Sequence, residues 1–198
     1  TISISKTTAS ETTFSYQSPV CSNAVNPSPL IAAGFTAGGI FSSSSGLTID
    51  ATSGIIDLKT STPGTYTVTY TVIQSPCTTG GSSTAGIVIN TAPSAPVTKG
   101  SQRCGSGVIT LDATASGTIN WYKNIDLKNA VATGSVYTAT ITGTTNFYLT
   151  ASNGNCESES VLVTANILPL PIKPDLGKTN TLCNGDIIVL KPGKYDNY

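Results

Sequence analysis

Residues 63–72 read Pro-Gly-Thr-Tyr-Thr-Val-Thr-Tyr-Thr-Val. From Thr65 onward, threonine alternates without a break with tyrosine or valine. Successive side chains of a β-strand point to opposite faces, so this segment sorts its residues by face. Tyr66, Val68, Tyr70 and Val72 share one face, and four threonines share the other. The segment predicts a half-buried strand with an apolar face toward a core and a threonine face toward water.

The flanking sequence continues the same pattern. Residues 47–50 and 55–58 are β-formers on either side of Ala51-Thr52-Ser53-Gly54, which predicts a β-hairpin. Elsewhere, runs of four to eight β-formers alternate with Gly, Ser, Asn and Pro, and no 11-residue window keeps a helical period. The predicted class is all-β.

Two proline-bearing segments, residues 91–96 and 168–174, follow strand-like runs and predict module junctions. After each comes a cysteine with a leucine seven residues further on, Cys104 to Leu111 and Cys183 to Leu190. This repeat predicts a tandem array of sandwiches. The expected parts are 1–11, the end of a preceding module and a linker; 12–92 and 93–168, two complete modules; and 169–198, a linker and the start of a third module.

The composition excludes several function classes. Ten Lys and Arg balance ten Asp and Glu, so no basic surface for nucleic acid is expected. The chain has no His, no Cys-x-x-Cys pair and no cluster of carboxylates. We therefore expect no catalytic residue, no metal site and no cofactor, although spatially paired carboxylates remain open. No run of 18 apolar residues occurs, so no membrane insertion of this segment is expected.

Five widely spaced cysteines favour disulfides and an exported chain. Module boundaries at the prolines place two cysteines in each complete module. The boundaries therefore predict Cys21 with Cys77 and Cys104 with Cys156, and leave Cys183 to a partner beyond Tyr198. A bridge across a junction, for example Cys77 to Cys104, is the alternative.

The segment Thr118-Ile119-Asn120-Trp121-Tyr122 predicts a strand that sends Trp121 into a sandwich core and Tyr122 outward. The polar loop that follows, residues 123–129, could touch a sugar or a protein partner. The alternative is an ordinary solvated hairpin. The candidate ligand contacts are Tyr122, Lys123, Asp126 and Lys128.

Three groups of motifs, which together cover nearly the whole chain, resemble known families. Residues 46–50, 53–56 and 63–68 resemble bacterial immunoglobulin-like or cadherin-like modules. A second group of motifs resembles the immunoglobulin-like repeats of Bacteroidetes cell-surface proteins. This group comprises Cys104, Leu111, Trp121-Tyr122, residues 133–137 and 144–148, and Cys156. Residues 182–186 and 190–193 are similar to modules of gliding-motility-associated proteins.

The resemblance implies immunoglobulin-like sandwiches joined end to end in a gliding adhesin of the SprB type. Such adhesins are exported by the type IX secretion system to the bacterial cell surface, where they support adhesion and movement. The implied partners are neighbouring modules, a surface polysaccharide or other adhesion target, and the secretion and gliding machinery. The motif positions are structural, so no catalytic residue carries over.

In one respect the motifs depart from antibody domains. Cys104 precedes the strand at residues 108–111, and Thr150 stands at the usual place of the second cysteine. The disulfide should therefore lie at one end of a module and not at the centre of its core. Two other functions stay open at this point: accessory modules of an exported polysaccharide-degrading enzyme, and a carbohydrate-binding module.

Overall fold

The computed structural model describes residues 9–76 and 78–172, and all regular structure in these residues is β-strand. The first six strands are β1 (Phe14–Ser15), β2 (Val20–Cys21), β3 (Leu30–Ile31), β4 (Ile40–Ser43), β5 (Gly64–Val72) and β6 (Gly81–Asn90). One sheet has the order β2-β6-β5-β4, and β1 pairs with β3 opposite it.

The remaining strands form a second sandwich. They are β7 (Val97–Lys99), β8 (Ser101–Cys104), β9 (Gly107–Thr114), β10 (Thr118–Tyr122), β11 (Ala130–Thr133), β12 (Val136–Ile141), β13 (Thr145–Ser152) and β14 (Val161–Leu168). Their sheets have the orders β11-β10-β13-β14-β8 and β12-β9-β7. The all-β prediction is confirmed, and the two modules are immunoglobulin-like sandwiches.

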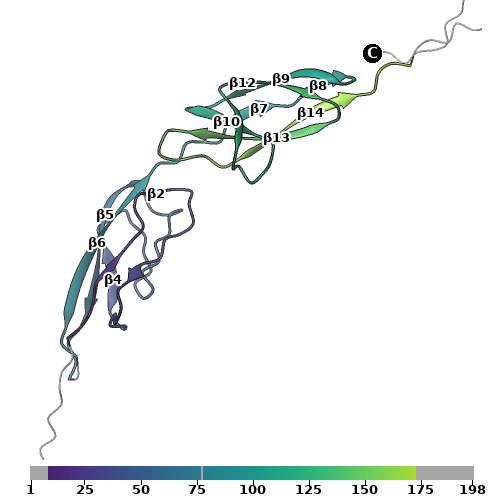
Figure 1. Ribbon diagram of the computed structural model, residues 1–198. Coiled ribbons are helices and arrows are strands. Elements are labelled where there is room, and N and C mark those ends of the chain that lie inside the picture. The colour runs from purple at the N-terminus through teal and green to yellow at the C-terminus, as the bar shows by residue number, and fades with distance from the viewer. Residues whose placement is uncertain (1–8, 77, 173–198) are drawn as a thin grey trace, which may run out of the picture.

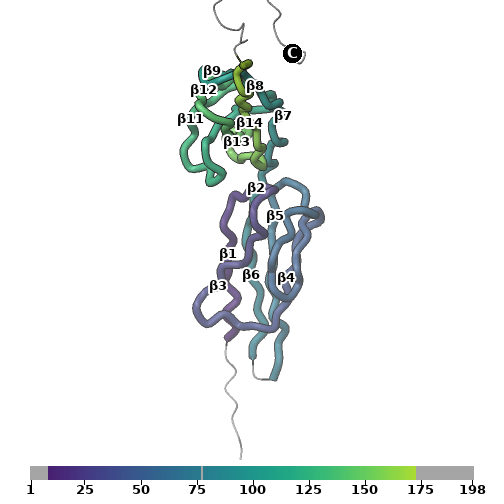
Figure 2. Tube along the Cα trace, turned by 90° about the vertical axis from the view of Figure 1, so that its right-hand side faces the viewer, coloured from purple at the N-terminus to yellow at the C-terminus, as the bar shows by residue number. Residues whose placement is uncertain are grey.

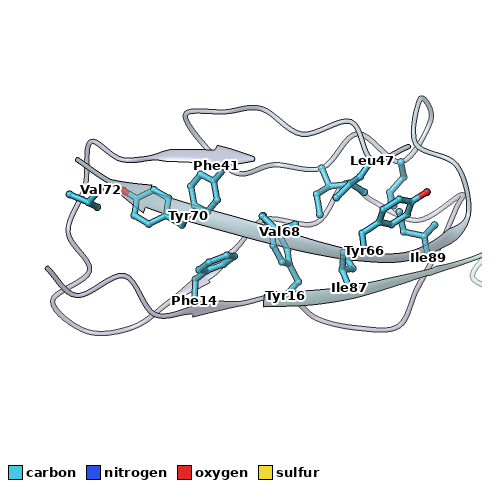
Figure 3. Close-up of a cluster of buried hydrophobic side chains, with 12 residues drawn as sticks. Phe14, Tyr16, Phe41, Leu47, Tyr66, Val68, Tyr70, Val72, Ile87 and Ile89 are labelled. Atoms are coloured by element: carbon cyan, nitrogen blue, oxygen red, sulfur yellow. The ribbon is translucent and has the colours of Figure 1, made fainter. Parts of the chain in front are cut away.

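The first core is rich in aromatic side chains, as Figure 3 shows. Tyr66, Val68, Tyr70 and Val72 of β5 are all buried, which confirms the alternation read from the sequence. Tyr70 lies among Phe14, Phe35 and Phe41, with ring centroids 4.5–6.4 Å apart. Aromatic rings at these separations pack more favourably than their buried area alone would give.

Trp121 is fully buried in the second core and donates from its indole nitrogen to the Gly134 carbonyl at 2.7 Å. The core placement predicted for Trp121 is therefore confirmed. The hydrogen bond satisfies the one polar atom of the side chain, which would otherwise be costly to bury. The predicted hairpin at residues 47–58 is reduced to an isolated antiparallel bridge between Ile49 and Ile56, and neither flanking segment is a strand. Gly54 in the connection takes a positive φ of 71°.

The two sandwiches are joined end to end, and β6 leads directly into the second (Figures 1 and 2). One set of core residues spans Phe14 to Ile89 and the other spans Ile109 to Ala165. Residues 1–8 of the expected end of a preceding module, and residues 173–198 of the expected linker and third module, lie outside the described residues.

Because the cores are separate, a cavity in one should affect mainly that one. Leu111→Ala removes a fully buried side chain of the second core and should cost about 2–5 kcal/mol of its stability. Trp121 is the only tryptophan in the chain, so its fluorescence reports the unfolding of the second module as denaturant is added. Val68→Ala in the first core is the matched control. A shift of the Trp121 transition as large for Val68→Ala as for Leu111→Ala would contradict the separation of the cores.

The cross-linked module junction as candidate functional site

Two covalent connections join the modules. One is the peptide chain from Asn90 to Val97, which includes Pro93 and Pro96. The other is a disulfide between Cys21 of the first module and Cys156 of the second, with a Cα–Cα distance of 5.8 Å. That distance lies within the range of bonded cysteines.

The predicted pairings of Cys21 with Cys77 and of Cys104 with Cys156 are therefore wrong. Cys104 is a free, exposed thiol, and Cys77 and Cys183 lie outside the described residues. Cys104 pairs in register with the last residue of β14, whereas Cys156 precedes the first residue of that strand. A strand of this length spans roughly 25 Å, so the two cysteines of the second module lie at its opposite ends. The expectation that the bridge ties a module end holds, but it ties the ends of two different modules.

The position of Cys21 follows from an unusual strand pair. β2 lies parallel to β6, with Cys21 opposite Asn90, the last residue of the first module's final strand. Ser22 then fixes the start of the linker: its backbone N–H donates to the Asn90 carbonyl at 2.9 Å, and its hydroxyl accepts from the Ala92 N–H at 3.1 Å. The cysteine is therefore held beside the point where the chain leaves the first module.

Asn153 organises the opposite side of the junction. Its side-chain oxygen accepts from the backbone N–H of Asn155 at 3.1 Å and of Cys156 at 2.8 Å, so the loop between β13 and β14 turns around it. Asparagine side chains commonly stabilise turns in this way. Its side-chain nitrogen donates to the Thr91 carbonyl at 2.9 Å, which ties the loop to the linker. Cys156 is buried at this turn.

Glu157 joins both modules as well. Its backbone carbonyl accepts from the Asn23 side chain of the first module at 2.9 Å. Its carboxylate accepts from the Asn120 side chain at 2.8 Å and from the Tyr122 hydroxyl at 3.3 Å. The residue next to the disulfide is thus held by both modules.

The prediction that Tyr122 points outward to a ligand is wrong, since only 5% of the residue is exposed. Its side chain does lie on the face of the sheet opposite to that of Trp121. Its hydroxyl, however, donates to the Glu157 carboxylate, and its ring is buried. Burial raises the pKa of Tyr122, and the nearby Glu157 carboxylate acts in the same direction. Tyr122 is therefore a structural residue of the second module.

The other candidate ligand residues, Lys123, Asp126 and Lys128, are exposed in the connection between β10 and β11. The structure does not bring them together with Tyr122, and their role in binding stays a prediction. Leu127 in this connection has a positive φ of 52°, as expected of a tight turn. Nothing in the sequence predicted the residues that do converge, because Asn23 is 134 residues away from Glu157 along the chain.

Two further features bear on ligand chemistry. A shallow hollow of about 350 Å³ in the first module is lined by Phe35, Phe41 and Tyr70 with serine and threonine hydroxyls, and by no charged side chain. Within residues 9–76 and 78–172, no three His, Cys, Asp or Glu side chains are grouped as a metal site would require. In the same residues no helix is long and apolar enough to span a bilayer.

One known family is similar in sequence to the second module. Residues 93–169 match the family model described as an Ig-like domain, CHU_C associated. A search of curated proteins gave no match. Disulfides persist in oxidising compartments, so the Cys21–Cys156 bond indicates an extracellular protein.

Several solved structures are similar to parts of this chain at low identity. Extracellular domains 3–5 of Drosophila OTK are 14% identical with a TM-score of 0.39, over 79% of this chain and 61% of that one. Fibronectin(III)-like modules of Clostridium thermocellum CbhA are 13% identical with a TM-score of 0.38, over 84% of this chain and 100% of that one. A SusE-like surface-located polysaccharide-binding protein from the Bacteroides thetaiotaomicron heparin utilisation locus is 13% identical with a TM-score of 0.35, over 78% of this chain and 33% of that one.

The bonds of Asn153 should influence the disulfide. Asn153→Ala removes the two acceptor bonds that shape the loop and the donor bond to Thr91, each worth about 0.5–1.5 kcal/mol. We expect the Cys21–Cys156 bond to become roughly tenfold easier to reduce at equilibrium with glutathione, which corresponds to about 1.4 kcal/mol. Asn155→Ala is the matched control, because its side chain takes no part in these bonds. Equal equilibria for the two variants would contradict the assigned role of Asn153.

Proposed function

We propose that this chain is a structural, load-bearing segment of a large bacterial cell-surface repeat protein. The observation that carries the proposal is the disulfide between Cys21 and Cys156, which joins consecutive modules by a second covalent path. A spacer that must hold its direction benefits from such a joint, whereas a segment that needs freely moving modules does not.

The joint resists bending because its connections leave the first module at different places. The linker continues from β6, the disulfide starts from the neighbouring edge strand β2, and Asn23 contacts Glu157 beyond it. Domains within a chain usually move relative to each other unless their interface is large. Here a second covalent connection limits that motion in place of a large interface.

The disulfide also redirects mechanical load. A pull on the two ends of the chain reaches Cys21, crosses the sulfur–sulfur bond and continues from Cys156. The intervening residues, a sequence separation of 135, lie outside this covalent path. An extended chain spans about 3.3–3.6 Å per residue, so the bond withholds roughly 45 nm of contour length from extension. Both cores lie almost wholly within the protected interval.

Single-molecule force spectroscopy on the 198-residue chain, held at its two ends, tests this load path. The oxidised chain should lack the extension from residues between Cys21 and Cys156, and reduction should add roughly 45 nm of contour length. The double variant Cys21→Ser, Cys156→Ser should behave like the reduced chain, and Cys104→Ser should behave like the oxidised one. An extension that is the same with and without reductant would contradict the proposal.

More specifically, we propose that the parent protein is a gliding-motility adhesin exported by the type IX secretion system. The match of residues 93–169 to the CHU_C-associated Ig-like family and the sequence motifs of the first and third modules support this. The segment itself is proposed to have no catalytic activity, in keeping with a sequence that lacks His. Its adhesive contacts would be made to a surface polysaccharide or another target of the parent protein.

Antibodies against this segment should label intact cells of the source bacterium, and brief protease treatment of the cells should remove the label. Deletion of the coding region for the parent protein should reduce attachment and spreading on a surface. A strain lacking an unrelated surface protein is the control. Label that appears only after cell lysis, or normal attachment and spreading in the deletion strain, would overturn the adhesin assignment.

A further inference from the structure

Cys104 is the one described cysteine that the junction does not use. It ends β8, the edge strand of the five-stranded sheet of the second module, and its thiol is exposed. In Figure 1, β8 and the end of β14 lie at the end of the second module away from the first. The thiol therefore lies where the chain leaves the second module.

The surroundings of Cys104 reproduce those of Cys21. Each cysteine ends an edge strand that runs parallel to the last strand of its own module, β2 beside β6 and β8 beside β14. Cys21 stands opposite Asn90, the last residue of β6, and Cys104 stands opposite Leu168, the last residue of β14. The two cysteines share both the parallel pairing and the register, so they occupy equivalent positions in the two modules.

The hydrogen bonds agree with the register. The N–H of Ser22, which follows Cys21, donates to the Asn90 carbonyl at 2.9 Å. The N–H of Gly105, which follows Cys104, donates to the Leu168 carbonyl at 3.0 Å. A proline-bearing segment follows the last strand in both cases. The second module thus presents a cysteine at its exit in the same way that the first module presents Cys21.

The first junction shows what such a cysteine binds. The partner of Cys21 is Cys156, which lies in the loop between the last two strands of the next module. We propose that Cys104 forms the corresponding disulfide with a cysteine in the loop between the last two strands of the module that follows residue 172. Successive modules would then be joined at every junction by a disulfide equivalent to Cys21–Cys156, and the load path would bypass most of each core.

Cys183 does not fit as this partner. In the sequence it stands seven residues before Leu190, as Cys104 stands seven before Leu111. By this spacing Cys183 corresponds to the exit cysteine of the following module, and its own partner would belong to the module after that.

The chemistry needs an oxidant. Two thiols give up two protons and two electrons when the sulfur–sulfur bond forms, and a disulfide-carrying oxidoreductase or oxidised glutathione accepts them and becomes two thiols. Such oxidants operate in the oxidising compartments where exported proteins acquire disulfides. Formation of the Cys21–Cys156 bond requires the same oxidant, so the second bond adds no new requirement.

Non-reducing peptide mapping of the protein from the cell surface, with thiols trapped by N-ethylmaleimide at low pH, tests the inference. Trypsin cleavage after Arg103 and Lys123 isolates Cys104 in a peptide without another cysteine. We expect this peptide to be linked to a cysteine between the last two strands of the following module. The link between Cys21 and Cys156 serves as the internal control for intact disulfides.

The matched variants give a second readout. Cys104→Ser should release one alkylatable thiol, located in the following module, and Cys21→Ser should release one at Cys156. A Cys104 that is alkylated in the surface protein, or linked to Cys183, would overturn the inference. The inference rests on the proposed tandem array but not on adhesion. Alkylated Cys104 in a surface-labelled protein would therefore leave the proposed function intact, whereas absence of the protein from the surface would overturn that function alone.

Discussion

The disulfide between Cys21 and Cys156 is the constraint on which the arrangement of the two modules depends. It closes a loop that contains nearly all of both cores, which should stabilise the folded state by about 5 kcal/mol in the chain-entropy account. A bridge within one module could give a comparable gain in stability. Only a bridge between modules also restricts the direction of one module relative to the next, and the load-bearing function that we propose rests on this property.

The sandwich architecture makes such a joint possible. Strands β2 and β8 each add to the edge of a sheet parallel to the module's last strand, so the residue that ends each strand lies beside the chain exit. The loop between the last two strands, in contrast, lies at the chain entry. At the described junction, the cysteine on the edge strand of the first module and the cysteine in that loop of the second therefore meet.

Hydrogen bonds convert this approach into a defined geometry. Asn153 turns the loop that carries Cys156 and also holds the linker at Thr91, while Ser22 holds the linker from the other side. The load path that we propose through the Cys21–Cys156 bond depends on this geometry.

The sequence alone determined the all-β class and several of its buried positions. Alternation over residues 65–72 predicted the buried face of β5, and the surroundings of Trp121 predicted its place in the core, because both depend only on local periodicity and apolar character. The tertiary structure decided which cysteines meet, since proline-marked boundaries assign a cysteine to a module but not to one of its ends. It also decided the environment of Tyr122: alternation placed its ring on the face opposite Trp121, but only the fold brought Glu157, 35 residues further along the chain, to its hydroxyl.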